Sequence, residues 1–284
     1  MSDNTLLLGP LLGLEGESYY TVCFMSPPTV NQARVAMGQA VVEARLLATL
    51  HTGKFWRAEV EMDIPNAGKT IDYQIELNDC IARDRLAQHR WQFYQPGKLE
   101  KPRLAYASCN GFSDLKLMNN TERPYALWEE LLQLHDASPF SALLMGGDQV
   151  YADSLWTVLP TLKAWNALPL DEKVKSRASK PMREQLDRFY CKLYCERWQQ
   201  ATLARVLATI PHVMMWDDHD IIDGWGSFPD ELQQCEVFKA IYTAASRYFE
   251  LFQLRGLSFN TITLQKAKPA SHYSLGFSFR GNTV

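Results

Sequence analysis

Residues 217–220 are the densest group of chemically active side chains in the sequence, because they are Asp-Asp-His-Asp. The apolar segment 213–215 precedes them and is typical of a buried strand. Three carboxylates this close repel one another, and burying them without a compensating cation is unfavourable. Ile221, Ile222 and Trp225 follow the group and indicate a partly buried loop, where unpaired acids are costly. The pattern predicts a metal site, with a helix cap or a solvated acidic loop as the alternative.

A second group of carboxylates has the same setting. Residues 146–153 are Gly-Gly-Asp-Gln-Val-Tyr-Ala-Asp and follow the apolar segment 142–145. Asp148 alone would be an ordinary turn residue, since Gly-Gly-Asp is common in loops. Together with residues 217–220, it predicts one site built from two loops that each follow a strand. Tyr151 packs in a core by default, but its phenolate is a chemically reasonable ligand for a trivalent metal.

Two further side chains have both a functional and a structural interpretation. Cys109 follows the apolar run 104–107, and a lone cysteine after a strand is usually a small buried hydrophobe. Only its place after a predicted strand makes it a candidate metal ligand. His219 lies among carboxylates that raise its pKa and favour the imidazolium form. That form suits a general acid or a group that stabilises developing negative charge, and the alternative is a structural hydrogen-bonded histidine.

The elements that must position these residues change in character near residue 98. Segment 1–98 combines short runs of β-forming residues with turn signals, and it predicts a small antiparallel sandwich. After a linker at 95–102, predicted strands alternate with helices, which favours a layered α/β domain over residues 99–284. The expected strands lie at 19–24, 40–50, 55–62, 70–77, 104–107, 142–145 and 211–215, and the expected helices at 121–134, 182–209 and 234–254.

The predicted α/β order places the candidate residues at one edge of a sheet. In open α/β sheets, ligands bind beyond the carboxyl ends of the strands. Cys109, the Asp148 loop and residues 217–220 each follow a predicted strand. We therefore expect them to converge at that edge.

Composition excludes several function classes. A formal net charge of −3 argues against a protein that coats nucleic acid, and the P-loop and dinucleotide-binding glycine patterns are absent. No segment approaches the roughly 18 apolar residues that span a membrane, and residues 1–14 lack the basic start of a signal peptide. The six cysteines include no CxxC pair, so we expect reduced thiols and a cytoplasmic location. The sequence predicts no oligomeric state.

Three motifs in the second part of the chain resemble those of a known enzyme family. Residues 107–110 are Ala-Ser-Cys-Asn, residues 147–153 are Gly-Asp-Gln-Val-Tyr-Ala-Asp, and residues 216–220 are Trp-Asp-Asp-His-Asp, followed by Asp-Gly-Trp-Gly at 223–226. In this order they resemble the PhoD-like (alkaline phosphatase D) branch of the calcineurin-type metallophosphatases, over roughly residues 100 to 284. The resemblance implies a layered α/β/β/α metallophosphatase core, preceded by the small β-sandwich domain of the family.

The resemblance also implies a multinuclear metal site that holds iron and calcium. By this resemblance, Cys109 and Tyr151 would be the thiolate and phenolate ligands of the iron. Asp148 would be the carboxylate that bridges the metals.

The third motif carries the remaining site residues that the resemblance implies. When it is aligned on its histidine with the wider superfamily, Asp218 takes the place of a metal-binding asparagine. His219 takes the place of the phosphate-facing histidine, and Asp220 that of its orienting acid. Asp217 falls on a glycine of the superfamily pattern and is the less typical metal ligand of this motif.

The activity that the resemblance implies is hydrolysis of a phosphomonoester or phosphodiester by metal-activated water. The family continues beyond this sequence and supplies further ligands from a later Asp and a His-containing motif. The resemblance therefore implies that residues 99–284 are the N-terminal part of a truncated metallophosphatase domain. The alternative is a catalytically inactive metallophosphatase-fold module that binds metal or another protein. A zinc hydrolase of another fold is a weaker alternative, because the HExxH spacing is absent.

Overall fold

The computed structural model describes residues 4–112, 114–256, 276 and 278–283. Its largest element is a seven-stranded mixed sheet in the order β10-β11-β12-β1-β2-β6-β5. The first four strands of that order run parallel, and the last three alternate in direction. The strands of this sheet are β1 (Leu8–Leu14), β2 (Tyr19–Ser26), β5 (Arg45–Thr49), β6 (Lys54–Glu61), β10 (Leu104–Ala107), β11 (Ala142–Gly146) and β12 (His212–Met215).

A five-stranded antiparallel sheet packs against one face of the larger sheet. Its order is β4-β3-β7-β8, with β9 also pairing with β7. In β7 the alternate residues Ile71, Tyr73, Ile75 and Leu77 are buried, as expected for a strand with one face in a core. These side chains share one core with residues of β1, β2 and β6. The strands are β3 (Ala33–Met37), β4 (Ala40–Glu43), β7 (Lys69–Leu77), β8 (Cys80–Ile81) and β9 (Trp91–Gln95), and a separate pair is formed by β13 (Ser278–Phe279) and β14 (Asn282–Thr283).

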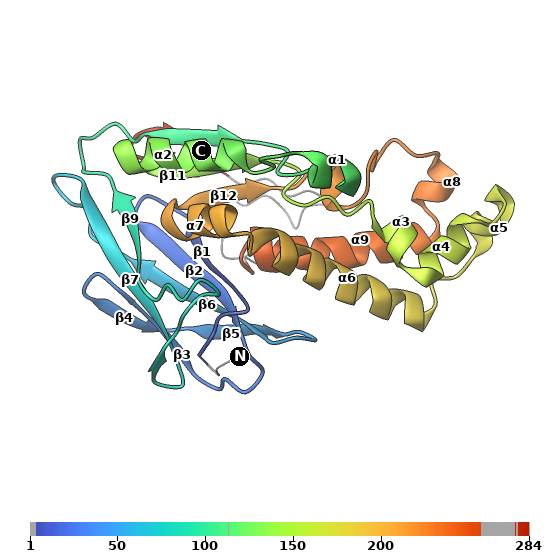
Figure 1. Ribbon diagram of the computed structural model, residues 1–284, viewed down its shortest axis with the longest axis horizontal. Coiled ribbons are helices and arrows are strands. Elements are labelled where there is room, and N and C mark those ends of the chain that lie inside the picture. Colours follow the sequence, from blue (N-terminus) through green and yellow to red (C-terminus); the bar gives the residue numbers. More distant parts are fainter. Residues whose placement is uncertain (1–3, 113, 257–275, 277, 284) are drawn as a thin grey trace.

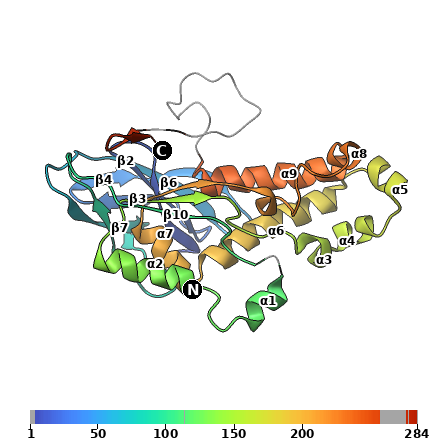
Figure 2. The ribbon, with the colours of Figure 1, turned by 90° about the horizontal axis from the view of Figure 1, so that it is seen from above.

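Helices build a second core and extend away from the sheets (Figure 1; Figure 2). Helix α7 contacts both β1 and β9, whereas α6 and α9 pack along each other. No described helix is long and apolar enough to cross a membrane. The helices are α1 (Leu115–Asn120), α2 (Ala126–Ala137), α3 (Leu155–Val158), α4 (Pro160–Asn166), α5 (Leu170–Lys175), α6 (Lys180–Trp198), α7 (Ala201–Thr209), α8 (Asp230–Gln233) and α9 (Glu236–Tyr248), with a 3-10 turn η1 (Asp218–Asp220) and a π-helical turn η2 (Phe249–Gln253).

The β-rich character expected for residues 1–98 matches the observed strands, but a separate small sandwich is not confirmed. Strand β1 pairs in parallel with β12, with Gly13 opposite His212. Four strands from the first part of the chain thus complete the sheet that carries β10, β11 and β12. The domain boundary near residue 98 stays a prediction, and the large sheet continues across it.

Two helices expected from the sequence differ from the observed elements. The long helical region expected at 182–209 consists of two helices, because the side chain of Gln200 caps the amides of Thr202 and Leu203 and starts α7. The helix expected from residue 121 begins at Ala126. Pro124 precedes it, and the segment before α2 is a turn.

His212 is a buried titratable group at the start of β12, and it makes unfolding sensitive to pH. Burial holds the pKa of its imidazole well below the usual value, and the charge of Arg255 adds to this. The unfolded chain then binds more protons than the folded chain below a pH of about 6.5, the ordinary pKa of histidine. The free energy of unfolding should fall as pH decreases through that value, by up to ~1.4 kcal/mol per pH unit for this one group.

Urea unfolding between pH 7.5 and pH 5 measures this slope. In the variant His212→Leu, the free energy of unfolding should depend less steeply on pH, by up to the slope that one bound proton causes. The variant lacks the group that titrates only in the unfolded state. The same change at the exposed His89 is the control. An unchanged slope in His212→Leu would contradict the prediction.

Candidate metal centre

Three loops at the carboxyl ends of β10, β11 and β12 form one continuous rim. The amide of Cys109 donates to the carbonyl of Gly147 at 3.0 Å, and the amide of Asn110 donates to that of Asp148 at 2.8 Å. The amide of Ala152 donates to the carbonyl of His219 at 2.9 Å. These bonds continue the parallel pairing beyond the strands and hold the candidate side chains in register. The convergence expected at the carboxyl edge is therefore observed.

Asp148 is the most buried carboxylate of the rim that lacks a full set of partners. The backbone φ of Asp148 is 52°, and the residue is only 6% exposed. The Oδ2 atom accepts a bond from the Cys109 thiol at 3.4 Å, whereas Oδ1 is buried without a hydrogen-bond partner. Burial raises the pKa of this carboxyl above its ordinary value, while the Cys109 thiol and His219 lower it. A bound cation would satisfy the unpaired oxygen, so the site fits a metal ion.

Asp148, Asp218 and His219 are close enough to share one ion. Each offers one ligand atom, and these three atoms lie within 4.8 Å of one another. The carboxylate of Asp218 is held by the amide of Gly224 at 2.7 Å and by the amide of His219 at 3.0 Å. Each of its oxygens keeps a further lone pair for a cation. The geometry thus brings Asp148 and Asp218 together, as the sequence predicted.

Asp217 lies at the rim but has a clear structural contact. Its Oδ1 atom accepts a bond from the amide of Asp218 at 2.9 Å and so caps the turn η1. A Cβ at position 147 would lie only 2.8 Å from the Cβ of Asp217, so Gly147 leaves no room for a side chain. Gly147 also has a φ of 132°, which side chains rarely tolerate. The glycine therefore permits the close approach of the β11 and β12 loops, and a ligand role for Asp217 stays a prediction.

His219 is oriented by Asp153. The Nδ1 atom of His219 lies 2.8 Å from Oδ2 of Asp153, and Nε2 lies 3.8 Å from Oδ1 of the exposed Asp223. Burial alone lowers the pKa of His219, but the bond to Asp153 and the charges of Asp153, Asp148 and Asp218 raise it above its ordinary value. The imidazolium form expected from the sequence is favoured, and its Nε2–H remains available to a ligand.

Asp220 does not contact the His219 ring in the way expected of an orienting acid. Its side chain turns inward, where it is 1% exposed and accepts bonds from the amides of Gln149, Val150 and Asp217 and from the Gln253 side chain. Burial raises the pKa of this carboxyl to about 7, although these hydrogen bonds act in the opposite direction. The turn η1 directs successive side chains to different sides, so Asp220 fixes the β11 loop, and Asp153 takes the place beside His219.

The ring of Tyr151 packs against the ring of His219 in a tilted arrangement. The two ring centroids lie 4.4 Å apart at an interplanar angle of 36°. Burial, together with the neighbouring Asp148 and Cys109, raises the pKa of the phenol well above its ordinary value. A neutral phenol is therefore favoured in the absence of a cation, and a phenolate here requires a strongly charged metal nearby. The structure thus brings Tyr151 and Cys109 close to Asp148, and their roles as metal ligands stay predictions.

Sequence reasoning missed three residues that hold the site. Asp153 orients His219, and it lies in the second motif five positions after Asp148. Gln149 and Gln253 surround Asp220, and the Trp198 indole donates to the Gln149 carbonyl at 3.4 Å. Only Asp153 had a sequence signal, because it is a carboxylate within a cluster already selected.

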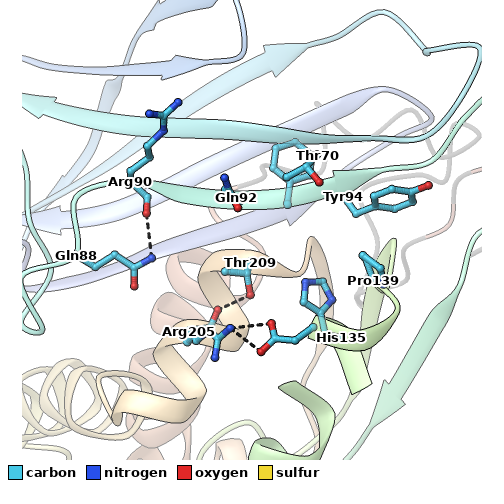
Figure 3. A pocket seen from close by; sticks show the side chains of 11 residues that line it. Thr70, Gln88, Arg90, Gln92, Tyr94, His135, Pro139, Arg205 and Thr209 are labelled. Atoms are coloured by element: carbon cyan, nitrogen blue, oxygen red, sulfur yellow. Dashed lines mark hydrogen bonds and ion pairs between the residues drawn. The ribbon is translucent and has the colours of Figure 1, made fainter. Parts of the chain in front are cut away.

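A separate polar pocket of about 350 Å³ lies between β9 and the helices α2 and α7 (Figure 3). Its lining includes Pro139 and Thr209, which precede β11 and β12. Its charged groups are already paired, since Arg205 donates to Asp136 at 2.7 and 2.8 Å. None of the rim residues lines it, so the two sites are distinct.

Comparisons with known proteins found a matching family profile and a related protein. The profile of a family described as PhoD related phosphatase matches residues 80–268. An uncharacterized protein of Saccharomyces cerevisiae is 30% identical over 215 residues, which are 70% of this chain and 29% of that protein. The chain therefore spans less than a third of the length of this relative.

Two solved structures are similar to the chain at low sequence identity. A structure of PhoD is 14% identical, with a TM-score of 0.55, and the match covers 92% of this chain and 48% of that one. A purple acid phosphatase from seeds of yellow lupin (Lupinus luteus) is 13% identical, with a TM-score of 0.43 over 83% of this chain and 39% of that one. The similarity to PhoD supports an α/β fold of the metallophosphatase type.

Proposed function

Since the chain belongs to the PhoD related phosphatase family, we propose that it hydrolyses phosphoric esters at the rim formed by Cys109, Asp148 and Asp218. The observation that carries the proposal is the buried Oδ1 of Asp148, which lacks a hydrogen-bond partner and lies beside the carboxylate of Asp218. A bound metal would supply Lewis acidity and a water of lowered pKa at this edge. Both phosphomonoesters and phosphodiesters are compatible substrates.

The candidate ligand atoms are of two chemical types, which suit two kinds of metal ion. Cys109 and Tyr151 offer a sulfur and a phenol oxygen near Asp148, which suits iron. Asp218 offers carboxylate oxygens near Asp148, with Asp217 as a further candidate, which suits calcium. Asp148 contacts the Cys109 thiol and lies near Asp218, so its carboxylate would help to hold either ion. Iron and calcium are therefore the ions that we propose for this centre.

His219 has the position and charge to act on the substrate. Its Nδ1 is occupied by Asp153, so Nε2 carries the proton that a phosphoryl oxygen or a departing alkoxide can accept. Asp153 holds the ring in one orientation and stabilises its positive charge. The buried carboxylate of Asp220 holds the loop after β11 in place, because it accepts bonds from the amides of Gln149 and Val150.

Metal content of the purified chain tests the proposal. We expect about two tightly held ions per chain, as in two-metal hydrolases. Asp148→Asn should lose at least one of them, because a neutral amide replaces the carboxylate. Asparagine tolerates the positive φ at this position, so the backbone should be retained. Asp171→Asn, on an exposed side chain, is the matched control.

Hydrolysis assays on the same samples decide between enzyme and module. A metal-loaded chain that cleaves p-nitrophenyl phosphate or bis(p-nitrophenyl) phosphate supports the proposal, and the ratio of the two rates gives its ester preference. A folded chain that holds metal but cleaves neither would instead fit the metal-binding or interaction module. A folded chain without metal would contradict both the metal centre and the mechanism.

A further inference from the structure

A pocket of about 260 Å³ opens directly beside the metal centre. Cys109 and Asn110 form one wall, and residues 123–128 at the start of α2 form the opposite wall. The indole Nε1 of Trp128 donates to the Asn110 side-chain oxygen at 2.8 Å and ties the two walls together. Because Cys109 belongs both to this pocket and to the rim, the pocket and the rim adjoin each other.

Arg197 gives the pocket a positive charge that the protein does not neutralise. It extends from the last turn of α6 and is half-buried. Its Nη1 donates to the sulfur of Met118 at 2.7 Å, and sulfur is a weak acceptor. Among the described residues, no carboxylate lies within ion-pair distance of it. A guanidinium in this state keeps most of its five donors for an anion.

Arg123, the other charged residue of the pocket, is not available to bind an anion. Arg123 is already paired with Glu129 and is largely exposed. The remaining lining is rich in aromatic side chains, namely Phe112, Tyr125 and Trp128. Such walls favour a flat apolar ring over a flexible polar chain.

We propose that this pocket binds the leaving group of the substrate, and that this group is an aromatic ring carrying a negative charge that Arg197 recognises. The proposal rests on the proposed phosphoric ester hydrolysis. Arg197 is then a specificity residue, which contacts the far end of the substrate and leaves bond breaking to the rim.

Two matched substrates test the charge requirement on the full chain. Phenyl phosphate and 4-carboxyphenyl phosphate differ only by the carboxylate on the leaving group. The unmutated protein should prefer the carboxylated ester in kcat/KM by about tenfold, the effect expected for a hydrogen-bonded charge. Arg197→Ala should remove this preference, mainly through KM, and Arg197→Lys should restore part of it. Arg188→Ala, an exposed arginine on the same helix, is the charge-matched control and should keep the preference.

Binding of the products separates this inference from the proposed function. The probes are 4-hydroxybenzoate and phenol, measured by calorimetry and by the fluorescence of the tryptophans. Binding of 4-hydroxybenzoate that Arg197→Ala abolishes supports the pocket even if no ester is cleaved. Hydrolysis of both esters at equal kcat/KM, with no selective binding of 4-hydroxybenzoate, would overturn the pocket and leave the hydrolase intact. If Arg197→Ala fails to fold, the preference of the unmutated protein and the Arg197→Lys variant decide the question.

Discussion

Changing His219 to glutamine is expected to lower kcat for phosphoric ester hydrolysis by ~10²–10⁴-fold, the usual contribution of a positioned general acid. Among the described rim residues, only the His219 imidazole combines a raised pKa with an N–H, at Nε2, that is not bonded to Asp153, the carboxylate that orients the ring. Glutamine keeps a hydrogen-bond donor of similar reach but cannot release a proton. The loss should therefore appear in kcat more than in KM.

The matched variants separate chemistry from metal loss and from misfolding. Asp153→Asn removes the charge that orients His219 and should cost roughly 10- to 100-fold, as second-layer changes at metal sites do. His89→Gln makes the same chemical change at an exposed histidine and should leave the rate unchanged. Metal content is measured for each variant, because a fall in bound metal would explain a slower rate by itself. A His219→Gln protein that keeps both its metal and its rate would exclude the acid role.

The convergence of the rim was predictable because it depends on a general property of parallel sheets. Cys109, Asp148 and Asp218 each follow an apolar run, and the carboxyl ends of neighbouring parallel strands meet at one edge. Which strands are neighbours was not predictable in full. The pairing of β1 with β12 joins segments almost 200 positions apart, and local periodicity carries no signal for such a contact.

The partner of His219 shows a second limit of sequence reasoning. Both Asp153 and Asp220 are carboxylates near a histidine, and spacing alone favours Asp220, which is adjacent in the chain. The choice between them depends on the path of the turn η1, which directs Asp220 toward the amides of the β11 loop. Residue type therefore identified the cluster, whereas the role of each carboxylate required its hydrogen bonds.

A buried ion cluster fixes the residues that follow η2 to the large sheet. Glu15 follows β1 at the same edge as the metal centre and accepts bonds from Arg57 at 2.9 and 2.5 Å and from Arg255 at 3.2 Å. The three side chains are 7% exposed or less. Gly13 leaves room for Arg255, since a Cβ there would lie 2.1 Å from its Nε. Arg255 in turn donates to the carbonyl of Gln253, whose side chain supports Asp220.

Glu15→Gln should lower the free energy of unfolding by ~3 kcal/mol, because it leaves the buried Arg255 without a carboxylate, whereas Arg57 keeps its bond to Glu59 at 2.7 Å. Urea denaturation measures the change, and Glu196→Gln is the control. Glu196 pairs with Lys192 at 3.5 Å on the surface of α6, where such a pair contributes only ~0.3–0.5 kcal/mol. A loss below about 1 kcal/mol in Glu15→Gln would mean that water or a neighbouring group replaces the carboxylate, which would contradict its burial. Because Arg255 is linked through Gln253 to Asp220, the same variant should also loosen the rim, and reduced metal retention in the folded protein would reveal that coupling.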